Sequence, residues 1–171
     1  NRTVCSSSSV SFSVGAASSK KQIYQWRKNG VNLVNGPTGN GSTISGATTA
    51  TLTINPATAG DSADSLTGYD CVISAPCETN SARVALTVNP TPTLFSLAGG
   101  GTICSGGSVT VILSGSQIGM DYRLRTNGVF NGVLVAGTGS PLSFPTLTAG
   151  GTYTVLASNL SGGCTAVMSG S

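Results

Sequence analysis

The segment Tyr24-Gln-Trp-Arg-Lys-Asn-Gly30 recurs in the second half of the chain as Tyr122-Arg-Leu-Arg-Thr-Asn-Gly128. Both copies follow the pattern Tyr-x-apolar-Arg-x-Asn-Gly. Apolar side chains at every second position are typical of a strand with one buried face, and Asn-Gly is favoured in two-residue hairpin turns. Each half is therefore expected to contain a core strand that runs into a hairpin.

Other landmarks repeat around this segment in the same order. A cysteine precedes an alternating apolar run in each half, at Cys5 and at Cys104. A Tyr-centred strand and a late cysteine follow, at offsets of about 85 to 99 residues. Repetition of this kind indicates a tandem duplication. We expect domains at 1–88 and 93–171, joined by a linker at 89–92 whose two prolines favour an extended spacer.

The composition favours strands and turns. The 171 residues include 24 glycines and 39% hydrophobic residues, whereas only 8% are charged and none is histidine. Short alternating runs separated by Gly, Asn and Pro predict an all-β chain of two tandem antiparallel β-sandwiches. The net charge of +3 comes from scattered basic residues, so we expect no nucleic-acid partner. No run of 18 apolar residues occurs, so we expect no membrane insertion.

The stretch Asp64-Ser-Leu-Thr-Gly-Tyr69-Asp-Cys71, together with Trp26, resembles the strand-F motif and core tryptophan of immunoglobulin domains. The resemblance implies two immunoglobulin-like sandwiches, in which Trp26 is the core residue of strand C and Tyr69 forms a tyrosine corner. Phe12 stands where the family has its strand-B cysteine, which leaves Cys71 as a free buried thiol. In the second half Leu124 replaces the tryptophan, so that half is similar only through the repeat.

A finer resemblance rests on the opening Val4-Cys5-Ser6, on the Tyr24 segment and on Gly101-Thr-Ile-Cys104-Ser-Gly-Gly-Ser. These motifs resemble the immunoglobulin-like repeats of large secreted Bacteroidetes-type proteins. The resemblance implies a structural or adhesive module of a cell-surface protein or fibre. It also implies O-glycosylation at Ser62 and Ser65, because each follows an aspartate and precedes a small or apolar residue.

Five cysteines allow fifteen ways of forming two bridges and leaving one thiol. Because the second half has only one early and one late cysteine, the repeat predicts bridges Cys104–Cys164 and Cys5–Cys77, with Cys71 left over. Such bridges require an oxidising, extracellular location. A metal site is not expected, because the thiols are scattered and histidine is missing, and nothing indicates a cofactor.

The sequence contains few side chains that could act as catalytic groups. A serine nucleophile would have no histidine base, and the five carboxylates are Asp61, Asp64, Asp70, Glu78 and Asp121. A glycoside-hydrolysing carboxylate pair or a calcium site among Asp61, Asp64 and Asp70 is the alternative. Hydrogen bonding in the turn before the Tyr69 strand explains Asp61 and Asp64 better. We therefore expect no catalytic residues and no enzymatic activity.

Three segments match the N-glycosylation pattern, and they begin at Asn1, Asn40 and Asn159. The last strand of the second domain is expected to be incomplete, either because the sequence is an excerpt from an array or because a neighbouring subunit donates a strand.

The sequence favours a non-catalytic structural or adhesive module of a long extracellular surface protein or fibre. Its expected partners are neighbouring domains or subunits and, less directly, surface glycans or proteins. One alternative is a filament subunit assembled by strand donation. A second is a carbohydrate-binding module of a secreted hydrolase, which needs a row of exposed aromatic side chains. Only Phe95 and Phe130 are candidates for exposure in such a row.

Overall fold

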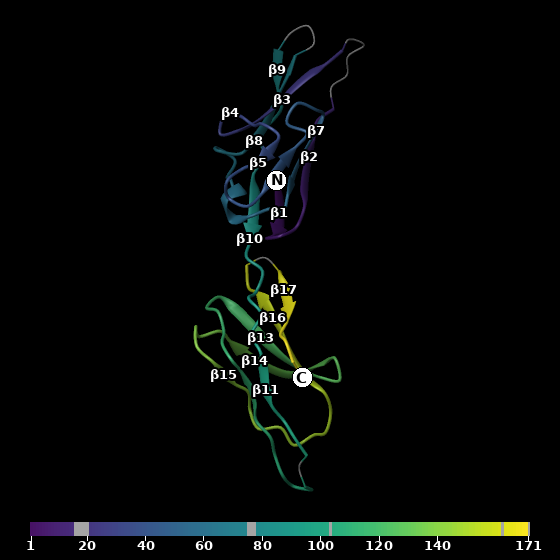
Figure 1. Ribbon diagram of the computed structural model, residues 1–171, viewed down its shortest axis with the longest axis vertical. Coiled ribbons are helices and arrows are strands. Elements are labelled where there is room, and N and C mark those ends of the chain that lie inside the picture. The colour runs from purple at the N-terminus through teal and green to yellow at the C-terminus, as the bar shows by residue number, and fades with distance from the viewer. Residues whose placement is uncertain (16–20, 75–77, 103, 162, 171) are drawn as a thin grey trace. The chain divides into compact units, whose positions relative to one another are not determined.

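The computed structural model describes residues 1–15, 21–74, 78–102, 104–161 and 163–170. The chain divides into two compact units, Asn1–Pro90 and Thr91–Ser171, and the boundary falls inside the segment that the sequence predicts as a linker. Strands build both units (Figure 1). The single helical element in the described ranges is the short 3₁₀ helix η1 (Ala59–Asp61). None of the described helical elements is long and apolar enough to span a membrane.

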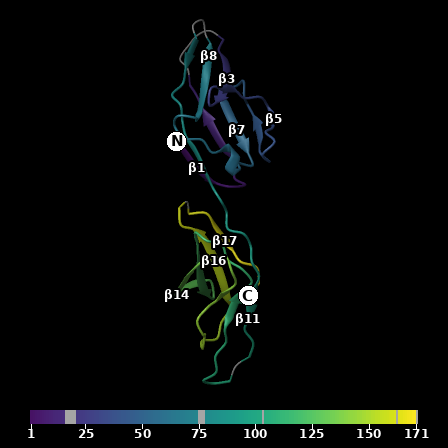
Figure 2. The same ribbon diagram turned by 90° about the vertical axis from the view of Figure 1, so that its left-hand side faces the viewer.

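The first unit is a sandwich of two four-stranded sheets, ordered β2-β7-β6-β5 and β4-β3-β8-β9. Figure 2 labels β5 and β7 of one sheet and β3 and β8 of the other. A further pair, β1 with β10, is parallel. The strands are β1 (Arg2–Cys5), β2 (Val10–Ser13), β3 (Ile23–Lys28), β4 (Val31–Asn32), β5 (Gly36–Pro37), β6 (Thr43–Ser45), β7 (Thr51–Asn55), β8 (Tyr69–Ser74), β9 (Glu78–Asn80) and β10 (Leu86–Asn89).

The core of the first unit forms where the two sheets face each other. Phe12 on β2, Trp26 on β3 and Tyr69 on β8 are 7%, 2% and 1% exposed. The Phe12 ring stacks on Tyr69 with 5.2 Å between centroids and lies 6.4 Å from Trp26. Cys71 is opposite Trp26 in the β3–β8 ladder and is a free, buried thiol. The aromatic ring of Phe12 therefore occupies the space in the core where a disulfide between this position and Cys71 would otherwise lie.

A tyrosine corner fixes the chain just before β8. The Tyr69 hydroxyl donates a 2.7 Å hydrogen bond to the Asp61 carbonyl oxygen, and burial raises the pKa of this hydroxyl. The Asp61 carboxylate accepts hydrogen bonds from the Thr58 backbone N–H at 2.8 Å and from the Ser42 hydroxyl at 2.8 Å. Both functional groups of Asp61 thus satisfy buried polar atoms in the turn.

The second unit has a three-stranded sheet ordered β11-β12-β15 and a four-stranded sheet ordered β14-β13-β16-β17. Its core contains Tyr122, Leu124, Phe144 and Val155. Leu124 faces Val155 in the ladder, at the place that Trp26 and Cys71 take in the first unit. The strands are β11 (Leu97–Gly99), β12 (Val111–Leu113), β13 (Met120–Thr126), β14 (Val129–Ala136), β15 (Leu142–Ser143), β16 (Tyr153–Asn159) and β17 (Thr165–Val167).

Sheet order and the tyrosine corner are those of immunoglobulin-like sandwiches, in which the core tryptophan and the corner tyrosine lie on neighbouring strands of the same sheet. The chain is all-β, with two such units in tandem.

Asn-Gly pairs behave differently in different places. Asn29 and Gly30 both have positive φ, 51° and 75°, as a two-residue hairpin turn requires, and they join β3 to β4. Asn131-Gly132 does not turn the chain. It lies within β14, where the pairing with β13 shifts register between Arg123 and Arg125. Val133 and Val135 pack on the core beyond this shift, so burying them keeps the strand in the sheet.

Candidate functional site

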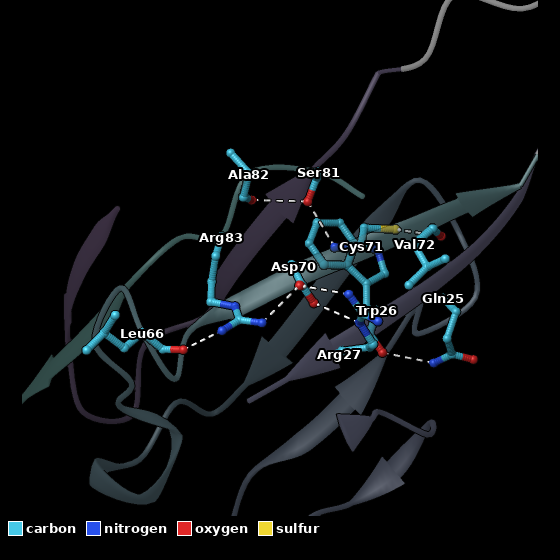
Figure 3. Close-up of polar contacts among 10 residues, drawn as sticks. All are labelled: Gln25, Trp26, Arg27, Leu66, Asp70, Cys71, Val72, Ser81, Ala82 and Arg83. Atoms are coloured by element: carbon cyan, nitrogen blue, oxygen red, sulfur yellow. Dashed lines mark hydrogen bonds and ion pairs between the residues drawn. The ribbon is translucent and has the colours of Figure 1, made fainter. Parts of the chain in front are cut away.

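Arg27, Asp70 and Arg83 form an ion-pair cluster on the first unit. Arg27 on β3 donates to both carboxylate oxygens of Asp70 on β8, from Nε to Oδ1 at 3.0 Å and from Nη2 to Oδ2 at 2.9 Å. Arg83 Nη2 reaches Oδ2 at 3.4 Å, and its Nη1 donates to the Leu66 carbonyl oxygen. Figure 3 shows both guanidinium groups converging on Asp70.

Local strand geometry places this cluster. Arg27 and Asp70 are register partners in the β3–β8 ladder, and each follows an inward-facing aromatic residue, so both side chains lie on the outer face of the sheet. Burial raises the pKa of Asp70, but the hydrogen bond and charge of Arg27, followed by those of Arg83, outweigh it and hold this pKa below its usual value. The hydrogen bond to Asp70 raises the pKa of Arg27. The two arginine contacts therefore favour the ionised form of Asp70.

The remaining acidic side chains before β8 serve the backbone. Asp64 Oδ1 accepts hydrogen bonds from the N–H groups of Leu66 and Thr67 at 2.8 and 2.7 Å. These bonds, with Thr67 first, hold the pKa of Asp64 below its usual value. Asp61, Asp64 and Asp70 therefore each have separate structural partners. In the described ranges, no group of three or more His, Cys, Asp or Glu side chains is placed to hold a metal ion.

The cysteines follow the sequence prediction only in part. Cys71 is free and buried, Cys104 is free and exposed, and Cys5 and Cys164 are disulfide-bonded. The predicted Cys104–Cys164 bridge is therefore wrong. The predicted partner of Cys5, Cys77, lies outside the described residues.

Strand direction explains why Cys104 and Cys164 do not meet. Ser96 and Ser169 form a parallel bridge in the second unit. Cys104 follows Ser96 along the chain whereas Cys164 precedes Ser169, so the two cysteines lie in opposite directions from the bridge. Bridged Cα atoms lie about 4.4–6.8 Å apart, while a strand rises about 3.3 Å per residue. The path from Ser96 to Cys104 includes the three-residue strand β11, and the path from Ser169 back to Cys164 includes the three-residue strand β17. Each of these strands is about 10 Å long, which is more than the Cα separation of a disulfide.

These environments predict an order of thiol reactivity. Cys104 should be alkylated in the folded protein under non-reducing conditions. Cys71 should react roughly 100-fold more slowly or slower, because it is buried, burial raises its pKa, and its exposure requires unfolding. Cys5 and Cys164 should react only after reduction. Mass-spectrometric mapping of alkylated peptides over time measures this order, and equal rates at Cys71 and Cys104 would contradict the buried position of Cys71.

The candidate glycosylation residues lie in different environments. Ser62, Ser65, Asn1 and Asn40 are exposed, and glycosylation of these four residues stays a prediction. Asn159 is only 8% exposed, and its Oδ1 accepts a hydrogen bond from the Ser161 N–H at 2.8 Å. A glycan at Asn159 also stays a prediction, at a residue that is mostly buried.

Aromatic side chains form no exposed row in the described residues. Trp26, Tyr69 and Tyr122 are core residues, and Phe95, which the sequence left as a candidate for exposure, packs partly buried against the second core. Phe130 is 46% exposed, and the Arg123 guanidinium lies 5.9 Å from its ring centroid. The described residues therefore do not provide the row of exposed aromatic side chains that the carbohydrate-binding alternative requires.

Sequence reasoning missed the convergence of Arg27 and Arg83 on Asp70. The sequence contains one signal for this contact. Arg27 and Asp70 each follow a core aromatic residue, on two strands that are expected to be neighbours.

No protein-family model matches the chain, and no curated protein matches it. Among solved structures, the chain is similar to the titin I-band fragment I67–I69, with 19% identity and a TM-score of 0.47 over 98% of this chain and 60% of that one. It is also similar to the N-terminal four immunoglobulin domains of Dscam1 isoform 8.4, with 17% identity, a TM-score of 0.41, and 98% and 42% coverage. A third similar structure is that of Sidekick-1 immunoglobulin domains 1–4, with 17% identity and a TM-score of 0.42 over 98% of this chain and 48% of that one. The chain thus spans about 60% of the titin fragment. These values do not assign the chain to a family.

Proposed function

We propose that this chain is a non-catalytic structural or adhesive module of an extracellular surface protein or fibre. One observation carries the proposal: the buried carboxylates are used to hold strands and turns together. Asp70 joins β3 and β8 through Arg27, and Asp61 satisfies the turn before β8. Carboxylates whose oxygens accept such hydrogen bonds stabilise the fold and are not available as a general acid or base.

The topology of the first unit supports a load-bearing role. β1 begins near the N-terminus of the unit and β10 ends near its C-terminus, and the two strands are parallel, with Arg2 opposite Leu86 and Cys5 opposite Asn89. A force applied to the two ends of the unit pulls these strands in opposite directions along their length. The hydrogen bonds of this ladder then share the load instead of breaking one after another.

The disulfide-bonded state of Cys5 and Cys164 supports an extracellular location, because such bonds persist in oxidising compartments. The partners that fit this role are neighbouring domains of an array or neighbouring subunits of a fibre. Origin in a Bacteroidetes-type surface protein is part of the proposal and rests on the sequence motifs alone.

Single-molecule stretching tests the mechanical role. Under reducing conditions we expect two unfolding events, each lengthening the chain by roughly 25 nm, which is about 3.4 Å per residue less the few nanometres that a folded unit already spans. Val4→Pro should lower the unfolding force of the first unit and cost about 1–3 kcal/mol. The Arg2 N–H donates to the Ala85 carbonyl just before β10, and the Ser6 N–H donates to the Asn89 carbonyl at its end. Alternation places the Val4 N–H on the same side, toward β10.

Thr3→Pro is the matched control, since its N–H faces away from β10, and it should leave the unfolding force close to that of the unmodified protein. Equal forces for the Val4→Pro variant and the unmodified protein would contradict the load-bearing ladder.

A further inference from the structure

One face of the second unit's four-stranded sheet carries a row of apolar side chains around an arginine (Figure 1). Arg123 on β13 is the register partner of Leu134 on β14 and of Leu156 on β16. Leu156 is in turn the register partner of Val167 on β17. Both neighbours of Arg123 along β13 are core residues, so this row lies on the outer face of the sheet. Leu134 and Val167 are exposed.

A second arginine lies beside this row. Arg125 is two residues further along β13 and is the register partner of Phe130 on β14. Alternate residues of a strand share a face and lie about 6.7 Å apart, so Arg125 is on the outer face with Arg123. Phe130 is exposed, and the Arg123 guanidinium lies 5.9 Å from the centre of its ring. The arginine face, as we name this surface, consists of Arg123, Arg125, Phe130, Leu134, Leu156 and Val167.

Neither arginine of this face has an ion pair within the described ranges, where both ion pairs are those of Asp70 in the first unit. Asp121 is the one carboxylate on the outer face of β13, two residues before Arg123, and it forms no ion pair with the described residues either. The strands β14, β16 and β17 carry no charged residue. The sheet therefore presents two positive charges and one negative charge on this face.

The first unit treats the corresponding arginine differently. Arg27 takes the place of Arg125 in the repeated segment. The register partner of Arg27 on β8 is Asp70, whereas the register partner of Arg125 on β16 is Thr154. An arginine is thus present in both units, but only the first unit supplies a carboxylate for it.

The neighbouring position differs in the same way. Gln25 takes the place of Arg123 in the repeated segment, and its Nε2 donates to the Trp26 and Leu33 carbonyl oxygens at 2.8 and 2.9 Å. The first unit thus satisfies this side chain internally. Among the described residues, the contact recorded for the Arg123 guanidinium is the one with the Phe130 ring, so its hydrogen-bond donors face solvent.

We propose that the arginine face is a docking surface for a partner protein that presents two carboxylates beside apolar side chains. The carboxylates supply the negative charge that Thr154 does not provide, and a carboxylate can accept two hydrogen bonds from one guanidinium. Carboxylates at alternate positions of an extended segment are about 6.7 Å apart, which matches the spacing of Arg123 and Arg125. The proposal names the partner for the adhesive role proposed above and rests on that role.

The apolar part of the face indicates that the partner is a protein. Phe130, Leu134 and Val167 are stabilised by burial only when apolar groups cover them. Nucleic acids and acidic polysaccharides offer charge but few such groups, and two arginines neutralise too few phosphates for tight binding to a nucleic-acid backbone. Protein interfaces, in contrast, are enriched in arginine and aromatic residues.

The test titrates the full chain with a capped peptide, Leu-Glu-Val-Glu-Leu, and follows backbone amides and arginine Nε–H groups by NMR. We expect saturable shifts at Arg123, Arg125 and the amides of β14 and β16, with a dissociation constant of roughly millimolar order. Amides of the first unit should stay unchanged. The peptide Leu-Lys-Val-Lys-Leu should not bind, because like charges face each other, and Ser-Glu-Ser-Glu-Ser should bind at least about threefold more weakly.

Protein variants locate the site and give the sign of the charge effect. The double variant Arg123→Gln, Arg125→Gln should weaken peptide binding at least about tenfold. Lys21→Gln removes the same kind of charge from an exposed residue of the first unit and should leave binding unchanged. Asp121→Asn removes the negative charge of the face and should tighten binding about two- to threefold. Unchanged amide spectra away from the face show that each variant is folded.

Equal binding by the double variant and the unmodified protein would overturn the proposal, and so would weaker binding by Asp121→Asn or the absence of shifts up to roughly 10 mM peptide. Tetragalacturonate, which has carboxylates but no apolar side chains, is titrated in parallel. Tighter binding of this glycan than of the peptide would overturn the protein partner. The stretching experiment concerns the first unit and does not depend on this face, so failure here is distinguishable from failure of the structural role.

Discussion

Trp26→Ala should lower the free energy of unfolding of the first unit by about 3–5 kcal/mol, the range for loss of a large buried aromatic residue. Trp26 is 2% exposed and lies against Phe12, and its indole N–H donates to the Thr49 carbonyl at 2.8 Å. The alanine variant would leave a cavity and an unsatisfied carbonyl at the centre of the sandwich. Denaturant titration followed by circular dichroism measures the loss as an earlier first transition.

Val31→Ala is the matched control on the next strand, β4. Val31 is an exposed apolar residue, so its truncation should change the free energy of unfolding by no more than about 0.5 kcal/mol. A Trp26→Ala variant that unfolds at the same denaturant concentration as this control would contradict the packing described for the first core.

Asp70→Asn should cost the first unit about 2–3 kcal/mol. Breaking a fully buried ion pair costs roughly 3–5 kcal/mol because the remaining charge is left without a partner. The expected loss is smaller here because the Arg27 and Arg83 side chains keep 21% and 35% of their surface exposed, so water solvates them in part. Thermal and denaturant unfolding of the variant measure this loss.

The same residue gives the first unit a defined pH dependence. The folded-state pKa of Asp70 is lowered, so its stabilisation is complete above the unfolded value of about 3.9 and is lost as the pH falls through the folded value. We expect the gap in stability between the unmodified protein and Asp70→Asn to be constant from about pH 7 to 5 and to close toward pH 3.

Asp64→Asn is the control for a carboxylate that is exposed. The pKa of Asp64 is also lowered, by hydrogen bonds from Thr67 and Leu66, so this variant should lose stability in the same pH direction but to a smaller extent. A gap between the unmodified protein and Asp70→Asn that widens as the pH falls would contradict the ion-pair assignment.

Local pattern was enough to predict the strands and core of the first unit. The alternation around Phe12 and Trp26 and the Gly-Tyr motif at Tyr69 are properties of short segments, and each segment buries the face that its period implies. The hairpin at Asn29-Gly30 follows for the same reason. Asn131-Gly132 differs because the valines that follow it have a core to pack against, and this tertiary contact overrides the turn preference.

Long-range pairing could not be predicted in the same way. The repeat matches Cys104 with Cys5 and Cys164 with Cys77 in sequence order, but order along the chain does not fix distance in space. The direction of the strands around Ser96 and Ser169 decides it. The Arg83 contact to Asp70 likewise depends on which strands are neighbours, which no single segment encodes.

Each unit is stabilised by its own core, and residue-resolved hydrogen exchange of a Leu124→Ala variant tests this most directly. Leu124 is fully buried in the core of the second unit. We expect amides of β13 and β16 to lose about 2–5 kcal/mol of protection, while amides of Trp26, Leu52 and Cys71 in the first unit keep theirs. An equal loss of protection at these first-unit amides would contradict two independent cores.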